Sequence, residues 1–149
     1  MLNPGPKYRD VPHLVAEKAF RSKFKSWDLG DLTYVDVREY LSKKDIILVP
    51  MASLEQHGQH LPLYTDTITA WEVATRVAEM TAVMHTPALW TGYSPQHMHK
   101  PGEGRGTITI RSSVLLNLIH DVARSLIHHG FNRIVFINGH GSNVKEVGS

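Results

Sequence analysis

Four side chains that can bind a metal ion lie within the short segment EQHGQHLPLYTD, residues 55–66. They are Glu55, His57, His60 and Asp66. The chain has no cysteine, so a bound metal must be held by imidazole and carboxylate groups, which suit Zn, Mn, Fe or Mg-like ions. The segment therefore predicts a divalent metal site without thiolate ligands.

A second polar cluster, NGHGSN at residues 138–143, lies far along the chain and adds His140 as a candidate ligand. Each cluster follows a short apolar run, residues 46–50 and 133–137, of the kind that forms parallel strands buried on both faces. Ligands of open parallel sheets bind beyond the carboxyl ends of the strands. We therefore expect both clusters to meet at one edge of a sheet.

Helices and further strands are expected between these runs. Helical spacing or capping residues indicate helices over 12–25, from Asp31 or Thr33 to Leu41, from Asp66 or Thr67 to Met80, and from Ser112 or Ser113 to a C-terminal Gly130. Strands are predicted at 83–89 and 107–110, with a long loop over 91–106. Strands that alternate with helices imply an α/β fold with a mainly parallel sheet.

The totals of the chain limit the classes of partner. Its 149 residues fit one domain, and a net charge of +2 does not indicate nucleic acid as a partner. No apolar stretch is long enough to span a membrane, and the N-terminus lacks the apolar core of a signal peptide. The expected location is therefore cytoplasmic.

The end of the chain gives a further expectation. About six residues follow Asn143, whereas a parallel α/β crossover needs about ten or more. We expect residues 1–149 to form a single domain that is incomplete at its C-terminus, either truncated or completed by a second chain.

Three motifs together resemble the creatininase (creatinine amidohydrolase) family. They are EQHGQHLPLYTD, then GYSPQHM with GTITI, then IVFINGHGSN, and they extend from about Ile46 to Asn143. The resemblance implies a three-layer α/β/α sandwich with a mostly parallel sheet. It also implies two divalent ions (Zn, Mn or Fe) held by Glu55, His57, Asp66 and His140, with Asp66 bridging them.

The same resemblance implies an activity and an assembly. Family members hydrolyse a C–N bond of a cyclic or small linear amide through a metal-activated bridging water, and they form homo-oligomers, often hexamers. The general acid of the family lies in the later third of its sequence, so no catalytic acid is assigned in this chain. Ser142 stands where creatinine hydrolases carry a glutamate, which argues against creatinine as the substrate.

Other polar residues are predicted to support the site or to contact substrate: His60, His97, Ser142 and Asn143. Simpler roles also fit some candidates, because Asp66 can cap a helix, His140 can occupy a turn and His97 can lie in a solvated loop. Two other functions stay open. The first alternative is a formamide or lactone hydrolase of the same family. The second is an inactive subunit that contributes half a site and needs a second chain for activity.

Overall fold

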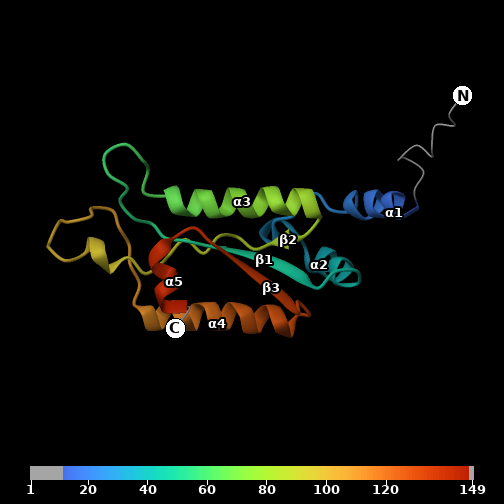
Figure 1. Ribbon diagram of the computed structural model, residues 1–149. Coiled ribbons are helices and arrows are strands. Elements are labelled where there is room, and N and C mark those ends of the chain that lie inside the picture. Colours follow the sequence, from blue (N-terminus) through green and yellow to red (C-terminus); the bar gives the residue numbers. More distant parts are fainter. Residues whose placement is uncertain (1–11, 148–149) are drawn as a thin grey trace, which may run out of the picture.

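The structure, a computed structural model, describes residues 12–147, and the side chains of residues 16–144. Five α-helices, three strands and two short 3-10 helices follow one another in this range (Figure 1). In chain order they are α1 Pro12–Arg21, η2 Leu29–Asp31, α2 Tyr34–Leu41, β1 Ile46–Met51, α3 Thr65–Thr81, β2 Met84–His85, η3 Pro95–His97, α4 Ser112–His128, β3 Arg133–Asn138 and α5 Gly141–Val147.

The sheet has the strand order β2-β1-β3, and both pairings are parallel. β1 and β3 pair in register from Ile46 opposite Arg133 to Met51 opposite Asn138. Both strands therefore end at the same level, and the loops that follow them leave from one edge. This arrangement confirms the predicted α/β fold with a parallel sheet.

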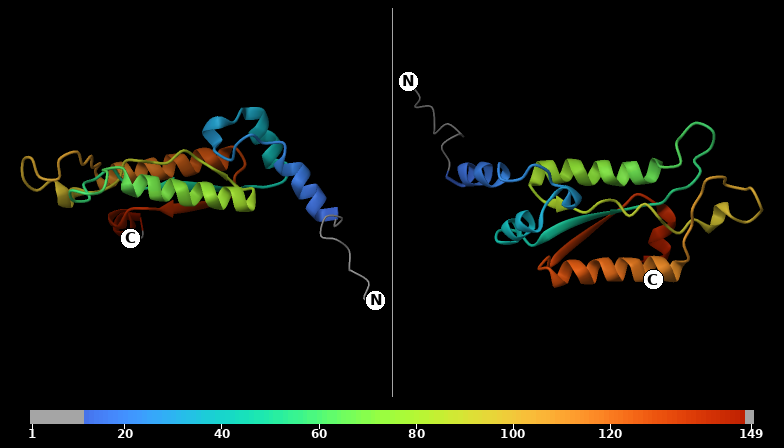
Figure 2. Two further views of the ribbon diagram at one scale, coloured as in Figure 1. Left: turned by 90° about the horizontal axis from the view of Figure 1, so that it is seen from above. Right: turned by 180° about the vertical axis from the view of Figure 1, so that it is seen from behind.

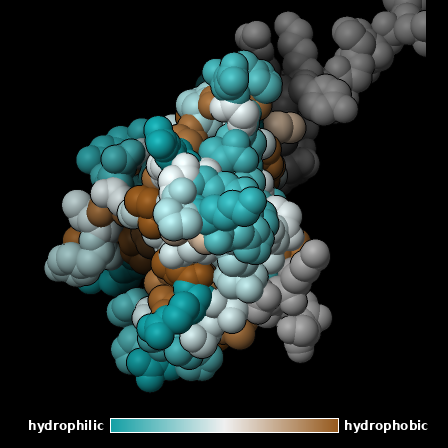
Figure 3. Space-filling view, turned by 90° about the vertical axis from the view of Figure 1, so that its left-hand side faces the viewer, coloured by the Kyte–Doolittle hydropathy of each residue, from teal (hydrophilic) through white to brown (hydrophobic). Residues whose placement is uncertain are grey.

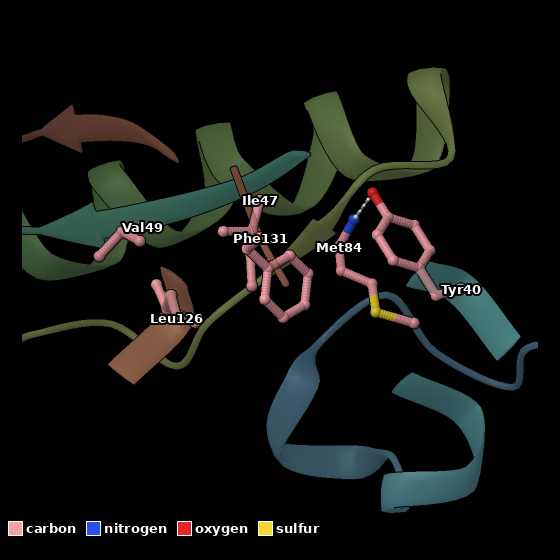
Figure 4. Close-up of a cluster of buried hydrophobic side chains, with 6 residues drawn as sticks. All are labelled: Tyr40, Ile47, Val49, Met84, Leu126 and Phe131. Carbon is pink, nitrogen blue, oxygen red and sulfur yellow. Dashed lines mark hydrogen bonds between the residues drawn. The ribbon is translucent and has the colours of Figure 1, made fainter. Parts of the chain in front are cut away.

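The central strand β1 is buried on both faces, as its uninterrupted apolar sequence predicts. Ile47 and Val49 join the cluster shown in Figure 4, together with Leu126 of α4. Leu48, which points to the opposite face, packs with Ala78 of α3. Alternate residues of one strand thus contact different layers, because successive side chains of a strand point to opposite faces.

The layers are visible in two opposite views. Helix α3 runs along one side of the sheet, and α4 and α5 lie on the other side (Figure 1 and Figure 2). Small residues on the inner face of α3, namely Ala70, Ala74 and Ala78, are completely or almost completely buried. Their size lets the helix approach β1 closely, which brings the first turn of α3 to the end of the strand.

Two of the predicted helix-end signals are present in the structure. Thr33 caps α2, and the Asp36 carboxylate accepts a hydrogen bond from the Thr33 backbone in return, which forms a capping box. Gly130 follows α4 with a φ of +106°, a conformation that favours glycine. The prediction of a serine cap for α4 is wrong: Arg111 is the cap residue, and its carbonyl accepts from the Val114 and Leu115 amides.

Two predicted strands do not form as expected: one is shorter, and the other is not a regular strand. The segment 83–89 forms a ladder only at β2, because Pro87 has no N–H to continue it, although Leu89 bonds to the Pro50 carbonyl. The segment 107–110 makes only isolated pairings, Ile108 with Leu54 and Thr109 with Gly92. This segment crosses from one partner to the other, so no regular ladder develops.

The prediction of a fully buried β3 is also wrong. Its residues are exposed or half-buried, and Val135 is 43% exposed. Within the described residues β3 is an edge strand of the sheet, so only one of its sides has a partner strand.

Candidate metal centre

Three candidate ligands meet at the carboxyl edge of the sheet. Glu55 follows β1, His140 follows β3, and Asp66 lies in the first turn of α3. One ligand atom of each lies within 4.8 Å of the others, and no other such group of His, Cys, Asp and Glu is found among the described residues. The two sequence clusters therefore meet at one edge, as predicted.

Asp66 lies at the centre of this group. Its Oδ1 is 3.0 Å from Nε2 of His57, and its Oδ2 is 2.9 Å from Nδ1 of His140. Oδ2 also accepts a hydrogen bond from the Ser53 hydroxyl at 3.0 Å. The cap residue of α3 is Tyr64, so the structure does not use Asp66 as the N-cap, although the helix dipole favours its charge. One carboxylate thus faces a different imidazole with each oxygen.

The ring of His57 is fixed by the backbone. Its Nδ1 lies 3.0 Å from the Glu55 carbonyl and must donate to it, which leaves Nε2 facing Asp66. Burial opposes the charged imidazolium, yet the hydrogen bond to the Glu55 carbonyl and the Asp66 carboxylate together raise the pKa of His57.

His140 is fixed in the same manner but through its other nitrogen. The side chain is buried, and Nε2 lies 3.0 Å from the Tyr93 carbonyl and 3.1 Å from the Ser94 hydroxyl. Because Nε2 donates to that carbonyl, Nδ1 faces the two carboxylates: Asp66 at 2.9 Å and Glu55 Oε1 at 3.5 Å. The residue does not serve merely as an exposed turn histidine.

The donor set fits a divalent cation. Two largely buried carboxylates lie beside two imidazole nitrogens whose opposite ring positions are bound to backbone carbonyls. Histidine ligands in metal sites are held in this way, by an outer hydrogen bond that fixes the tautomer and aims the free lone pair. Carboxylate and imidazole ligands without thiolates suit Zn, Mn or Fe.

Close contacts between main-chain atoms bring together the segments that carry the candidate ligands. A Cβ on Gly139 would lie 2.5 Å from the Asp66 carbonyl oxygen, and one on Gly92 would lie 2.4 Å from the Ala52 carbonyl oxygen. Only glycine permits these approaches, since neither carbonyl can move away without shifting the main chain. The two glycines therefore let β3 and the loop after β2 lie directly against the ligand-bearing backbone.

Asn143 connects three segments beneath the site. Its side-chain amide donates to the Ala52 carbonyl at 3.1 Å and to Asn138 Oδ1 at 3.2 Å, while its own Oδ1 accepts from the Tyr93 amide at 3.0 Å. The residue is 1% exposed. This geometry assigns Asn143 to bracing the site and leaves its amide no hydrogen for a substrate.

The remaining predicted residues differ in their positions. His97 lies beside Glu55, with Nε2 at 3.5 Å from Oε2. His60 is exposed, and Ser142 is half-buried at the start of α5; neither has a hydrogen bond of its side chain in the described structure. Their roles stay predictions.

Sequence reasoning missed Ser53, Tyr93 and Ser94. Ser53 carries a usable signal, because it is the first polar residue after a buried apolar strand. Tyr93 contacts His140 through its main-chain carbonyl, and a pattern of side chains in the sequence cannot predict such a contact.

Loops 55–64 and 98–106 project from the end of the molecule at which the carboxyl edge of the sheet lies (Figure 1). Figure 3 faces this end and shows a largely hydrophilic surface with apolar side chains exposed between the teal regions. Exposed apolar residues on and near these loops include Leu61, Met98 and Ile108. The surface around the site is thus of mixed character.

Comparison with known proteins identifies the family. The family model described as creatininase, creatinine amidohydrolase, matches residues 30–148. The chain belongs to the creatininase family. None of the described helices combines the length and the apolar composition needed to cross a membrane.

Three curated relatives show the range of the family. A creatinine amidohydrolase of Pseudomonas putida is 33% identical over 123 residues, which cover 80% of this chain and 46% of the relative. A mycofactocin precursor peptide peptidase of Mycolicibacterium smegmatis is 39% identical over 117 residues, covering 74% and 45%. A 3-dehydro-scyllo-inosose hydrolase of Thermotoga maritima is 30% identical over 111 residues, covering 74% and 34%.

Solved structures of the family agree with the fold. A crystal structure of creatinine amidohydrolase (creatininase) superimposes with a TM-score of 0.75 at 32% identity, covering 83% of this chain and 49% of that one. Other creatininase structures are described as the Mn form and as a Zn-Zn type. The chain spans between about a third and about half of the length of the relatives that it matches.

Proposed function

We propose that this chain carries the metal-binding part of a metal-dependent amidohydrolase. The observation that carries the proposal is the arrangement around Asp66, whose two oxygens face two imidazole nitrogens while Glu55 lies within reach. Asp66 would hold divalent ions together with Glu55, His57 and His140. The Zn and Mn forms of creatininase support this choice of metals.

Two bound divalent ions would supply Lewis acidity and lower the pKa of a water molecule. The residues of this chain hold that centre in place. The Glu55 and Tyr93 carbonyls set the ring orientations of His57 and His140, and Ser53 fixes one oxygen of Asp66. We assign no general acid among the described residues.

The substrate is proposed by class. An amide C–N bond in a cyclic or small linear molecule is the first candidate, as in the creatinine amidohydrolase relative. A peptide C–N bond is the second, favoured by the 39% identity to a mycofactocin precursor peptide peptidase. Formamides and lactones are alternative substrates of the same chemical centre.

Metal analysis of the complete protein tests the proposal. We expect about two divalent ions per chain, and a loss of metal from the Glu55→Ala, Asp66→Ala and His140→Ala variants. His99→Ala is the matched control, because His99 is an exposed histidine outside the site. Less than one Zn, Mn or Fe per chain, unchanged by Glu55→Ala or His140→Ala, contradicts the proposal.

A substrate panel separates the candidate activities. Lactams, short peptides, formamides and lactones are offered to the metal-loaded protein, and activity must disappear with a chelator and return with Zn or Mn. Hydrolysis of lactams alone supports the first candidate, and hydrolysis of peptides supports the second.

A further inference from the structure

His97 is held in one orientation beside the candidate ligand Glu55. His97 is the last residue of η3, in the segment 91–106 that was predicted to be a loop. Its side chain is nevertheless only 21% exposed. Nε2 lies 3.5 Å from Glu55 Oε2, and Nδ1 lies 3.0 Å from the side-chain nitrogen of Gln56. Both ring nitrogens therefore have a polar neighbour.

The neighbouring amide determines which nitrogen of His97 carries the hydrogen. Gln56 Oε1 accepts a hydrogen bond from the Gly58 amide at 2.9 Å, so the Gln56 NH2 group must be the one that faces His97. Nδ1 of His97 accepts from that group, and the ring hydrogen is consequently on Nε2. This hydrogen points towards the carboxylate of Glu55.

The glycine-rich loop 100–106 lies in close contact with the backbone of His97. A Cβ on Gly104 would lie 2.5 Å from the His97 carbonyl oxygen and 2.6 Å from its Cβ, and Gly104 has a φ of +56°. Only glycine permits this contact without a shift of η3. The loop therefore restricts the position of the His97 backbone, in addition to the contact that Gln56 makes with the ring.

We propose that His97 is a positioning residue for Glu55. Its Nε2–H faces Oε2 of the carboxylate at 3.5 Å, a polar contact longer than a normal hydrogen bond, while Oε1 faces Nδ1 of His140 at 3.5 Å and the candidate metal centre. Gln96, whose amide lies 3.4 Å from the same Oε2, adds a second donor. The proposal rests on the proposed function, because it gives His97 a purpose only if Glu55 binds a metal.

The physical reason is the cost of ordering a flexible ligand. A glutamate loses rotamer freedom when it binds an ion, and an outer hydrogen bond that orders it beforehand removes part of that cost. Loss of such an outer partner weakens metal binding by about 10- to 100-fold. The effect is on affinity for the ion, and it requires no contact between His97 and the ion.

The test measures Mn²⁺ affinity in the complete protein, by competition with a chromogenic chelator. His97→Leu removes the donor, and we expect Mn²⁺ binding about 10- to 100-fold weaker. His97→Gln keeps a donor near the position of Nε2, and we expect an affinity within about threefold of the original. His99→Leu is the matched control on the same loop and should leave the affinity unchanged.

The outcomes separate this inference from the proposed function. If the original protein binds no Mn²⁺, Zn²⁺ or Co²⁺, both the inference and the proposed function are wrong. If it binds Mn²⁺ and His97→Leu binds equally well, only the inference is wrong. Equal weakening in His97→Leu and His97→Gln also overturns the inference, because packing of the side chain rather than its polar contact with Glu55 then sets the affinity. Far-ultraviolet circular dichroism of the metal-free variants verifies that each one is folded.

Discussion

The two ends of the sheet both bury polar groups, but they satisfy them differently. At the amino end the Tyr40 hydroxyl donates to the Ile46 carbonyl at 2.7 Å and accepts from the Met84 amide at 3.3 Å, the bond drawn in Figure 4. At the carboxyl end two carboxylates, Glu55 and Asp66, converge on the same nitrogen of His140. The first network is complete without any added group, whereas the second has more acceptors than hydrogens.

This difference separates a structural network from a binding one. Burial raises the pKa of Tyr40 to about 12, so its hydroxyl stays a neutral donor under all ordinary conditions. Buried carboxylates that share too few donors are costly unless a cation or a proton joins them. The comparison predicts that changes at the amino end alter stability alone, while changes at the carboxyl end alter both stability and metal binding.

Gly139→Ala should give the largest effect. The added Cβ meets the Asp66 carbonyl oxygen and lies 3.1 Å from the Ala70 side chain, so the first turn of α3 must move away from β3. We expect a loss of about 3 kcal/mol in the free energy of unfolding, since overpacked sites lose 1–3 kcal/mol or more. Urea unfolding measures the loss, and metal analysis should show that the ions are lost as well.

Gly141→Ala is the matched control for that variant. A Cβ at Gly141 has no atom within 4 Å, and the residue begins α5. Its unfolding free energy should be unchanged or slightly higher, because alanine favours helix. Equal stability of the two variants would show that the contact with Asp66 does not set the spacing of the site.

Tyr40→Phe should give an intermediate effect at the other end. The change leaves the Ile46 carbonyl and the Met84 amide without their shared partner in a buried place, which costs about 1–3 kcal/mol. Thermal unfolding measures this loss, with Tyr34→Phe as the control because Tyr34 is 80% exposed. Metal content should be unchanged, and a fall in metal content would remove the distinction between the two ends.

Asp45→Asn should give the smallest effect and a characteristic pH dependence. Hydrogen bonds from Arg133 hold the pKa of Asp45 below its ordinary value of 3.8 and join the starts of β1 and β3. A lowered pKa in the folded state contributes stability above pH 3.8 and loses it as the pH falls through the folded value. The stability difference between the original protein and Asp45→Asn should therefore shrink in acid, as urea unfolding between pH 6 and pH 2.5 would show.

Local sequence patterns were sufficient for the elements that hold the site. The apolar run at 46–50 and the helical spacing after Asp66 gave β1 and α3 within one or two residues, because both depend on burial of a periodic set of side chains. The polar residues after β1 and β3 then had to meet, since the strands are parallel and end together. Glu55 and His140 were found for this reason.

Contacts made by loops and main chain were beyond the sequence. His97 lies in a segment without periodicity, and its place beside Glu55 depends on Gly104 and Gln56, which approach from different loops. The Tyr93 carbonyl has no side-chain signature. The exposed residues of β3 were misjudged because burial of a strand depends on its neighbours as well as on its own composition.

The two backbone carbonyls that orient the imidazoles determine which residues could replace the two histidines. They leave Nε2 free on His57 and Nδ1 free on His140, and this choice is made by the path of the main chain rather than by any replaceable side chain. A glutamine reaches about as far as the first of these nitrogens, and an asparagine about as far as the second. An engineer who wishes to alter the charge or metal preference of the centre while keeping its dimensions would therefore need different substitutes at the two histidines.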